Sequence, residues 1–219
     1  MLANFKNNVV PNVSRLDGNT IDDEERVSFG MVSGTSVDSH IRSVDWTDSI
    51  IENCRFNNTT LKNSSFDRVA ILDCDLSGVT FSNCLLRECL IMGVNAKYHF
   101  ALDDCILDHV MFARSRVDRF DIHNTRIVDI EFLGVEASQL DFFNCQAHKR
   151  KGSVSFDGCE LRKISGLEAM GTHGVNVHVD ATMWRDLGDS YLRERGFQQL
   201  VERKASESRI LDDIANQRD

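Results

Sequence analysis

The sequence predicts an all-β solenoid that ends in an α-helical segment, and two repeating patterns carry this prediction. An apolar residue stands at every fifth position from Ile41 to Ala96 and, after a shift of one residue, from Leu102 to Ala147. Two residues before each of these positions stands a small or β-branched residue, such as Cys54 or Thr59, with larger residues only after the shift. Neither the helical period of 3.6 nor the strand period of 2 produces a period of five.

A chain with this period must turn a corner every five residues. Two of every five side chains then point inward, one large and one small, and the other three face water. Four such sides close a coil of about twenty residues, and each coil buries its faces only by stacking on the next at about 4.8 Å. The repeats from Ile41 to Ala147 therefore predict a rod roughly 25–30 Å long.

Two runs carry a resemblance to a known family. The segments CRFNN-TTLKN-SSFDR (54–68) and CDLSG-VTFSN-CLLRE (74–88) resemble the pentapeptide-repeat proteins, whose motif is a small residue, a polar residue, Leu or Phe, and two variable residues. The resemblance implies a right-handed quadrilateral β-helix. Cysteine, threonine, serine or valine stands where the family most often has alanine, which changes the packing but not the predicted fold. The family's repeats mainly build a scaffold, so the resemblance is specific for fold rather than for function.

The chain divides into three parts. Residues 1–26 show no repeat, and because the open end of a solenoid must be covered, we interpret them as a partly ordered cap, with a flexible tail as the alternative. Residues 27–181 form the solenoid, in which Phe29 and Met31 already fit the inward columns of a first, less regular coil. Residues 182–219 form the C-terminal helical segment.

The five-residue period is interrupted twice. The shift at Lys97–His99 predicts a bulge or a short corner loop. The spacing from Ala147 to Phe156 is nine residues instead of five, so the stretch 146–153 must project from the rod. Surface loops on rigid scaffolds often carry function, and a solvated excursion without function is the other interpretation. The predicted loop carries four candidate partner-binding residues on an otherwise acidic chain, which are His148, Lys149, Arg150 and Lys151.

The repeats give way to a strand and then to helices near the C-terminus. Residues 174–179 alternate as a strand does, and from Asp180 the apolar residues follow a helical spacing. The segment 174–197 resembles the closing segment of gyrase-protecting pentapeptide-repeat proteins, with Gly174-Val175 and Arg195-Gly196-Phe197 at comparable places. That segment forms a homodimer in the group, although the tail after residue 197 is longer here. The resemblance implies a dimer interface of Trp184, Leu187, Tyr191 and Phe197.

Composition excludes several classes of function. The net charge of −9 argues against a sequence-reading nucleic-acid binder and against attraction to anionic membranes. No apolar run is long enough to span a membrane, and no basic segment followed by an apolar run marks a secretory leader at the start. We therefore expect a cytoplasmic protein.

Cysteines and histidines do not form a predicted site. Six of the seven cysteines occupy the small inward column, where cysteine serves as a buried apolar residue. Stacked Cβ atoms about 4.8 Å apart are too distant for a disulfide, which needs about 3.8 Å, so we expect reduced thiols. The histidines are scattered, and no phosphate loop, nucleophile elbow or paired-cysteine zinc spacing is present. We expect no catalytic residue, cofactor or metal, and no enzymatic activity.

Two functional hypotheses remain. The group that this chain resembles mimics duplex DNA, binds DNA gyrase or topoisomerase IV, and protects it from fluoroquinolones or gyrase poisons. From Ile41 to Ala147 the chain has sixteen acidic and ten basic side chains, and arginines share the most acidic side, so an ordinary acidic surface is an equally open interpretation. Four-sided wrapping places six candidate partner-binding acids on one side, which are Asp45, Asp48, Asp67, Glu88, Asp108 and Asp129.

The second hypothesis is a structural or adaptor protein that binds another protein partner.

Overall fold

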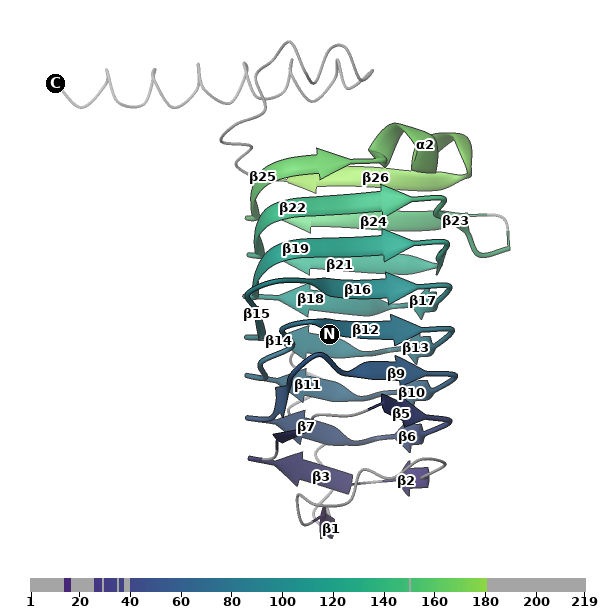
Figure 1. Cartoon of the computed structure of the whole chain (residues 1–219). Coiled ribbons are helices and arrows are strands. Elements are labelled where there is room, and N and C mark those ends of the chain that lie inside the picture. The colour runs from purple at the N-terminus through teal and green to yellow at the C-terminus, as the bar shows by residue number, and fades with distance from the viewer. Residues whose placement is uncertain are drawn as a thin grey trace, which may run out of the picture.

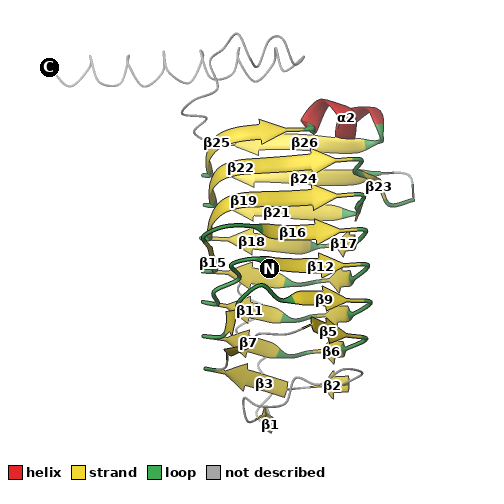
Figure 2. Ribbon diagram, in the orientation of Figure 1, coloured by secondary structure: helices red, strands yellow, loops and turns green. Residues whose placement is uncertain are grey.

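The structure is a computed structural model that describes residues 14–16, 26–28, 30–34, 36–37, 40–149 and 151–180. These residues form a single rod of stacked β-coils, with every named strand pair running parallel (Figure 1). One short helix lies at the C-terminal end of the stack (Figure 2). The predicted all-β solenoid is therefore confirmed, whereas its handedness remains a prediction.

Three long sheets form three sides of the rod. Sheet 1 contains, in spatial order, β1 (Ser14–Leu16), β3 (Gly30–Ser33), β7 (Ile50–Glu52), β11 (Ala70–Leu72), β14 (Leu90–Met92), β18 (Val110–Ala113), β21 (Asp129–Leu133), β24 (Gly152–Asp157) and β26 (Val175–Asp180). Sheet 2 contains β2 (Arg26–Ser28), β6 (Asp45–Thr47), β10 (Ser65–Asp67), β13 (Leu85–Arg87), β17 (Ile106–Asp108), β20 (Arg126–Ile127) and β23 (Gln146–Ala147). Sheet 3 contains β5 (His40–Arg42), β9 (Thr60–Lys62), β12 (Val79–Ser82), β16 (Phe100–Asp103), β19 (Arg116–His123), β22 (Glu136–Phe143) and β25 (Glu160–Ser165).

A fourth side is built from shorter pairings. Isolated bridges join Arg55 to Asp75 and Asp75 to Asn95, and the first residues of β19 and β22 continue this column. Its short strands are β4 (Ser36–Val37), β8 (Arg55–Phe56) and β15 (Asn95–Ala96). Each coil thus visits four sides, as the five-residue period predicts.

The strand register follows the predicted coil length. Phe66 pairs with Trp46 and with Leu86, one coil of twenty residues on either side. At the predicted shift the offset becomes twenty-one residues, because Val79 pairs with Phe100. The added residue is taken up at a corner, where the side chain of Tyr98 is 75% exposed.

The predicted inward positions form one continuous core. The residues at every fifth position and those two residues earlier are buried along the whole repeat, and only Ala147 is partly exposed. Phe112, Phe132 and Phe156 stack face to face through successive coils, with ring centroids 5.3 and 4.9 Å apart. All seven cysteines are free and buried, and burial raises the pKa of Cys89 to about 12.

Left-handed backbone at the corners explains why the outward positions are rich in Asn, Asp and Gly. Asn53, Asn58 and Asn63 have φ of 52°, 49° and 53° at three successive corners. Short polar side chains and glycine tolerate this region better than other residues do. At Gly78 a Cβ would in addition collide with the side chain of Asn58, which occupies the same corner one coil earlier.

The N-terminal end differs in detail from the expectation. Strand β1 lies inside the segment predicted to be a cap, and it pairs with β3 as the first strand of sheet 1. The buried position in β3 is Val32, which pairs with Ile51, whereas Met31 is only partly buried. Placing Met31 in the inward column was therefore wrong by one residue. Phe29 lies outside the described residues.

The C-terminal end of the solenoid carries a helix that the sequence analysis did not predict. Helix α2 (Leu167–Thr172) follows β25 and lies over the end of the rod (Figure 1). Leu167 and Met170 are buried in the common core. Gly166 turns the chain into the helix with a φ of 86°, at a point where any Cβ would collide with the backbone of Phe142. The predicted strand follows as β26, and the helices predicted in 182–219 lie outside the described residues.

Candidate partner-binding faces

The six candidate acids lie along one side of the rod, as predicted. Asp45 and Asp67 point outward from β6 and β10 of sheet 2, and Asp108 ends β17 of the same sheet. Asp48 and Glu88 follow at the corners between sheets 2 and 1, with left-handed backbone at both residues. Asp129 begins β21 at the same corner.

Arginines neutralise the acids in the N-terminal part of this side. The Nε and Nη2 groups of Arg68 donate to both carboxylate oxygens of Asp48 at 2.6 and 2.8 Å, and its Nη1 group donates to Asp67 at 2.9 Å. Arg87 donates to the same Asp67 from Nε and Nη2 at 2.9 and 2.7 Å. Three coils are thus joined by a ladder of charge-assisted hydrogen bonds.

The protonation of this ladder follows from its hydrogen bonds. The hydrogen bond from Arg87 is the main cause that holds the pKa of Asp67 below its ordinary value of 3.8, with Arg68 acting in the same direction. The hydrogen bond to Asp48 raises the pKa of Arg68 in turn. At neutral pH all these groups are charged and paired, so this part of the side presents little net negative charge.

The acids farther along the same side have different partners. Asp108 Oδ1 lies 2.6 Å from Nδ1 of His109, and Asp129 accepts a hydrogen bond from the hydroxyl of Ser153. Within the described residues no arginine forms an ion pair with Glu88, Asp108 or Asp129. The acids of this side that lack an arginine ion pair therefore lie between β13 and β21. Glu88 is still close enough to Arg68 and Arg87 to interact with their charges, and Arg126 on β20 lies on the same side.

The basic loop is shorter than predicted. Gln146 and Ala147 form β23, and residues 152–153 belong to β24, so the stretch 146–153 does not project as a whole. The projecting part begins at His148, whose amide still donates to the carbonyl of Ile127 at 2.7 Å. Lys149 and Lys151 are exposed, and Arg150 lies outside the described residues.

The predicted dimer interface cannot be placed on this structure. Trp184, Leu187, Tyr191 and Phe197 all lie outside the described residues. In the described part of the chain, no helix is long and apolar enough to cross a membrane.

A cluster on sheet 3 was missed by the sequence analysis. Ligand atoms of Asp121, His123 and Asp141 lie within 4.8 Å of one another, and carboxylates with an imidazole suit a divalent cation. The Asp121 side chain, only 3% exposed, already has two partners, His99 Nε2 at 3.0 Å and Arg119 Nε at 2.8 Å. Its charge is thus balanced by the protein itself. The twenty-residue spacing of Asp121 and Asp141 was the signal that could have revealed the cluster.

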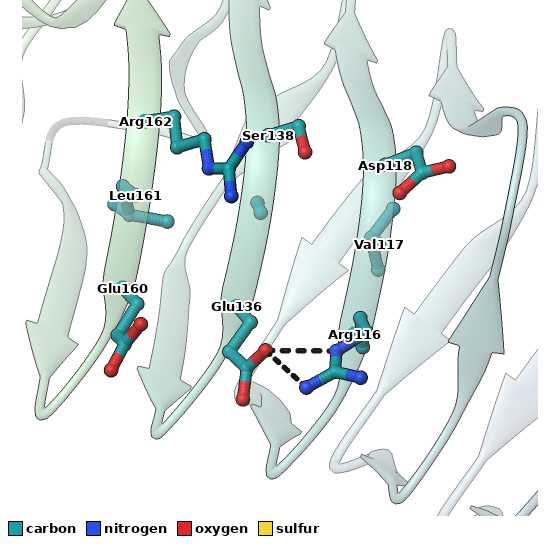
Figure 3. Close-up of a pocket in the computed structure, with 9 residues that line it drawn as sticks. Arg116, Val117, Asp118, Glu136, Ser138, Glu160, Leu161 and Arg162 are labelled. Carbon is teal, nitrogen blue, oxygen red and sulfur yellow. Dashed lines mark hydrogen bonds and ion pairs between the residues drawn. The ribbon is translucent and has the colours of Figure 1, made fainter. Parts of the chain in front are cut away.

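The fourth side of the rod carries a polar groove. Arg116 donates from Nε and Nη2 to Oε2 of Glu136 at 2.8 and 2.6 Å, across β19 and β22. Glu160 and Arg162 on β25 continue the lining, as Figure 3 shows. Charges of both signs alternate along this surface, so it lacks the apolar lining of a typical small-molecule site.

Register and burial decide the class of the solenoid. The buried residue recurs at every fifth position, and strand partners from β5 to β22 lie twenty or twenty-one residues apart. The chain is a four-sided solenoid of five-residue repeats. No protein-family model matches its sequence, and no curated protein matches it.

Two solved structures are similar to this repeat solenoid. One is QnrB1, a plasmid-mediated fluoroquinolone resistance protein, with a TM-score of 0.33 and 13% identity over 83% of this chain and 93% of that chain. The other is HetL, a pentapeptide-repeat protein involved in heterocyst differentiation regulation from the cyanobacterium Nostoc sp. strain PCC 7120. Its TM-score is 0.32, with 8% identity over 75% of this chain and 86% of that chain. Similarity at this level carries no functional argument, and the assignment of the fold rests on the register.

The outer face of sheet 1 is a second feature of the repeat solenoid that the sequence analysis missed. The strands β11, β14 and β18 are apolar at every position, inward and outward alike. Their outward side chains form a small apolar cluster that is separate from the core. The signal was present in the runs AIL, LIM and VMFA, because a parallel strand that is buried on both faces is apolar throughout. The outward members are Leu72, Leu90, Met92, Met111, Ala113 and Leu133.

Proposed function

We propose that this chain is a non-enzymatic cytoplasmic protein that binds a protein partner along the sheet 2 side of its solenoid. The observation that carries the proposal is the row of outward acids on this side, held at fixed spacing by the parallel register. A rigid ladder presents such charges to a partner without any cost of ordering them.

The partner that we propose is DNA gyrase or topoisomerase IV, protected from fluoroquinolones or gyrase poisons by a rod that imitates duplex DNA. Duplex DNA carries one charge per about 1.7 Å of axis, and the ion pairs of Arg68 and Arg87 leave this side far more dilute. We therefore assign the contact to the part without arginine partners, which holds Glu88, Asp108 and Asp129.

A supercoiling assay with purified gyrase and a fluoroquinolone tests the proposal. The wild-type protein should restore supercoiling or reduce drug-induced cleavage. The triple variant Glu88→Gln, Asp108→Asn, Asp129→Asn should lose most of this effect. The matched control Asp48→Asn, Asp67→Asn, which changes acids already neutralised by arginine, should keep it. No effect of the wild-type protein on either reaction would reject a topoisomerase partner.

The basic loop and the C-terminal segment have proposed roles in the same complex. Lys149 and Lys151 would contact an acidic patch of the enzyme or the DNA itself, so replacing both with alanine should weaken protection. Residues 182–197 would join two rods end to end in a homodimer. A monomeric mass of the intact protein in sedimentation equilibrium would reject that role.

An adaptor protein with another partner is the second candidate. The partly exposed outward residues Leu72, Met92 and Leu133 of sheet 1 favour it, because apolar side chains on a protein surface commonly mark contacts with other proteins. If the triple variant above still binds immobilised gyrase, and a variant with a charge on the outer face of sheet 1 does not, this candidate is favoured over mimicry.

A further inference from the structure

The apolar cluster on sheet 1 is built by the same alternation that builds the core. Ile71, Ile91 and Phe112 point inward, so their neighbours along each strand point to the opposite face. The parallel register then stacks Leu90 directly beside Met111 and Met92 directly beside Ala113. The result is a continuous outward patch that crosses β11, β14, β18 and β21, which lie next to one another in the rod (Figure 1).

The large outward side chains of this face are more deeply buried than their counterparts on sheet 2. Leu90, Met111 and Ala113 are 6%, 7% and 1% exposed. On sheet 2, one side away in the same two coils, the outward residues Leu85 and Ile106 remain partly exposed.

We propose that this apolar face is a docking surface for residues 1–13 of the same chain. That segment continues directly from β1, which is the edge strand of sheet 1. Five strand spacings of about 4.8 Å separate β1 from β18, or about 24 Å. Thirteen extended residues span up to about 43 Å, so the segment reaches the whole patch.

The composition of this segment suits the patch. Leu2, Phe5, Val9, Val10 and Val13 supply apolar side chains. The only charged side chain among the first thirteen residues is that of Lys6, so docking brings little charge onto an apolar surface. The competing segment, 181–219, is rich in charged residues along its whole length.

The docked segment has a physical consequence for the whole molecule. An uncovered apolar patch on a sheet face promotes association between copies or with other proteins. Docking of residues 1–13 would cover this face of sheet 1.

Crosslinking in the full-length protein tests the location. A photoreactive phenylalanine analogue at Phe5 should crosslink within one chain to peptides that contain residues 90–92 or 110–113. Crosslinks to residues 181–219, or between two chains, would overturn the proposal and identify the other occupant.

Methionine oxidation gives an independent measure of coverage. In the wild-type protein Met92 and Met111 should react slowly with hydrogen peroxide, and the variant Phe5→Asp, Val9→Asp should oxidise them several-fold faster.

The matched control for this measurement is the variant Asn4→Asp, Asn8→Asp. It adds the same charge one residue away from each apolar position. Neighbouring side chains of an extended segment point to opposite faces, so this variant should leave the oxidation rates of Met92 and Met111 unchanged. Circular dichroism must show the same β-content in all three proteins. Equal oxidation rates in both variants and the wild type would overturn the proposal.

Discussion

Sheets 1 and 2 share one backbone design but present opposite chemistry on their outer faces. On sheet 2, Asp67 lies between two arginines in a ladder of ion pairs. On sheet 1, Leu90 and Met111 stack into an apolar patch. The inward residues specify the coil, so the three outward residues of each repeat are free to give every side its own surface. Function in such a rod is therefore a property of one side rather than of the fold.

The largest expected losses of stability come from inward side chains, which lie beneath the outer faces of both sheets. These losses should therefore not distinguish sheet 1 from sheet 2. Phe112→Ala on sheet 1 and Leu107→Ala on sheet 2 each remove a fully buried inward side chain. We expect the free energy of unfolding to fall by about 3–5 kcal/mol in Phe112→Ala and by about 2–5 kcal/mol in Leu107→Ala. Urea denaturation checks both values. A loss below about 1 kcal/mol for either variant would contradict the inward position assigned to that residue.

A smaller effect should separate the two outer faces. Met111→Ala on sheet 1 removes a side chain that is nearly as buried as the core, and we expect a loss of about 2 kcal/mol in the free energy of unfolding. Ile106→Ala, at the equivalent outward position of sheet 2, should cost less than about 1 kcal/mol because its side chain is already partly in water. Equal losses in the two variants would show that sheet 1 is not covered.

The smallest effect concerns the ion-pair ladder and depends on pH. The pKa of Asp67 is lower in the folded protein than its ordinary value of 3.8, so its charge stabilises the fold above that pH. This contribution is lost as the pH falls below 3.8 and the folded carboxylate is protonated. Asp67→Asn should therefore be slightly less stable than wild type at pH 7, by at most about 1 kcal/mol. The difference should shrink toward pH 3 and in high salt, as thermal melts would show.

Much of the fold could be predicted because stacking imposes a strict period. Every residue of the inward columns from Ile41 to Phe142 was placed correctly, since each inward side chain must pack against the same position of the next coil. Helix α2 could not be predicted, because the spacing of Leu167 and Met170 also fits a loosened repeat. The collision that requires Gly166 is visible only in three dimensions.

The places of the candidate residues on the rod could be predicted, but their ion pairs could not. Four-sided wrapping correctly placed Asp48, Asp67 and Arg68 on one side, yet which carboxylates the arginine contacts depends on side-chain conformations that a sequence does not show. The loop after Ala147 was predicted too long because strand pairing extends into both of its ends. The apolar face of sheet 1 was missed because the outward residues were examined for charge alone.

The near-constant separation of about one coil between paired strands also governs how this chain folds. Every strand from β9 to β22 needs only the coil just made, twenty or twenty-one residues away, and none waits for a distant part of the chain. Folding in such a linear array begins at one coil and spreads to its neighbours. The stacked rings of Phe112, Phe132 and Phe156 join three successive coils, so we expect folding to start in that region. Loss of structure at either end then shortens the rod without dissolving its middle.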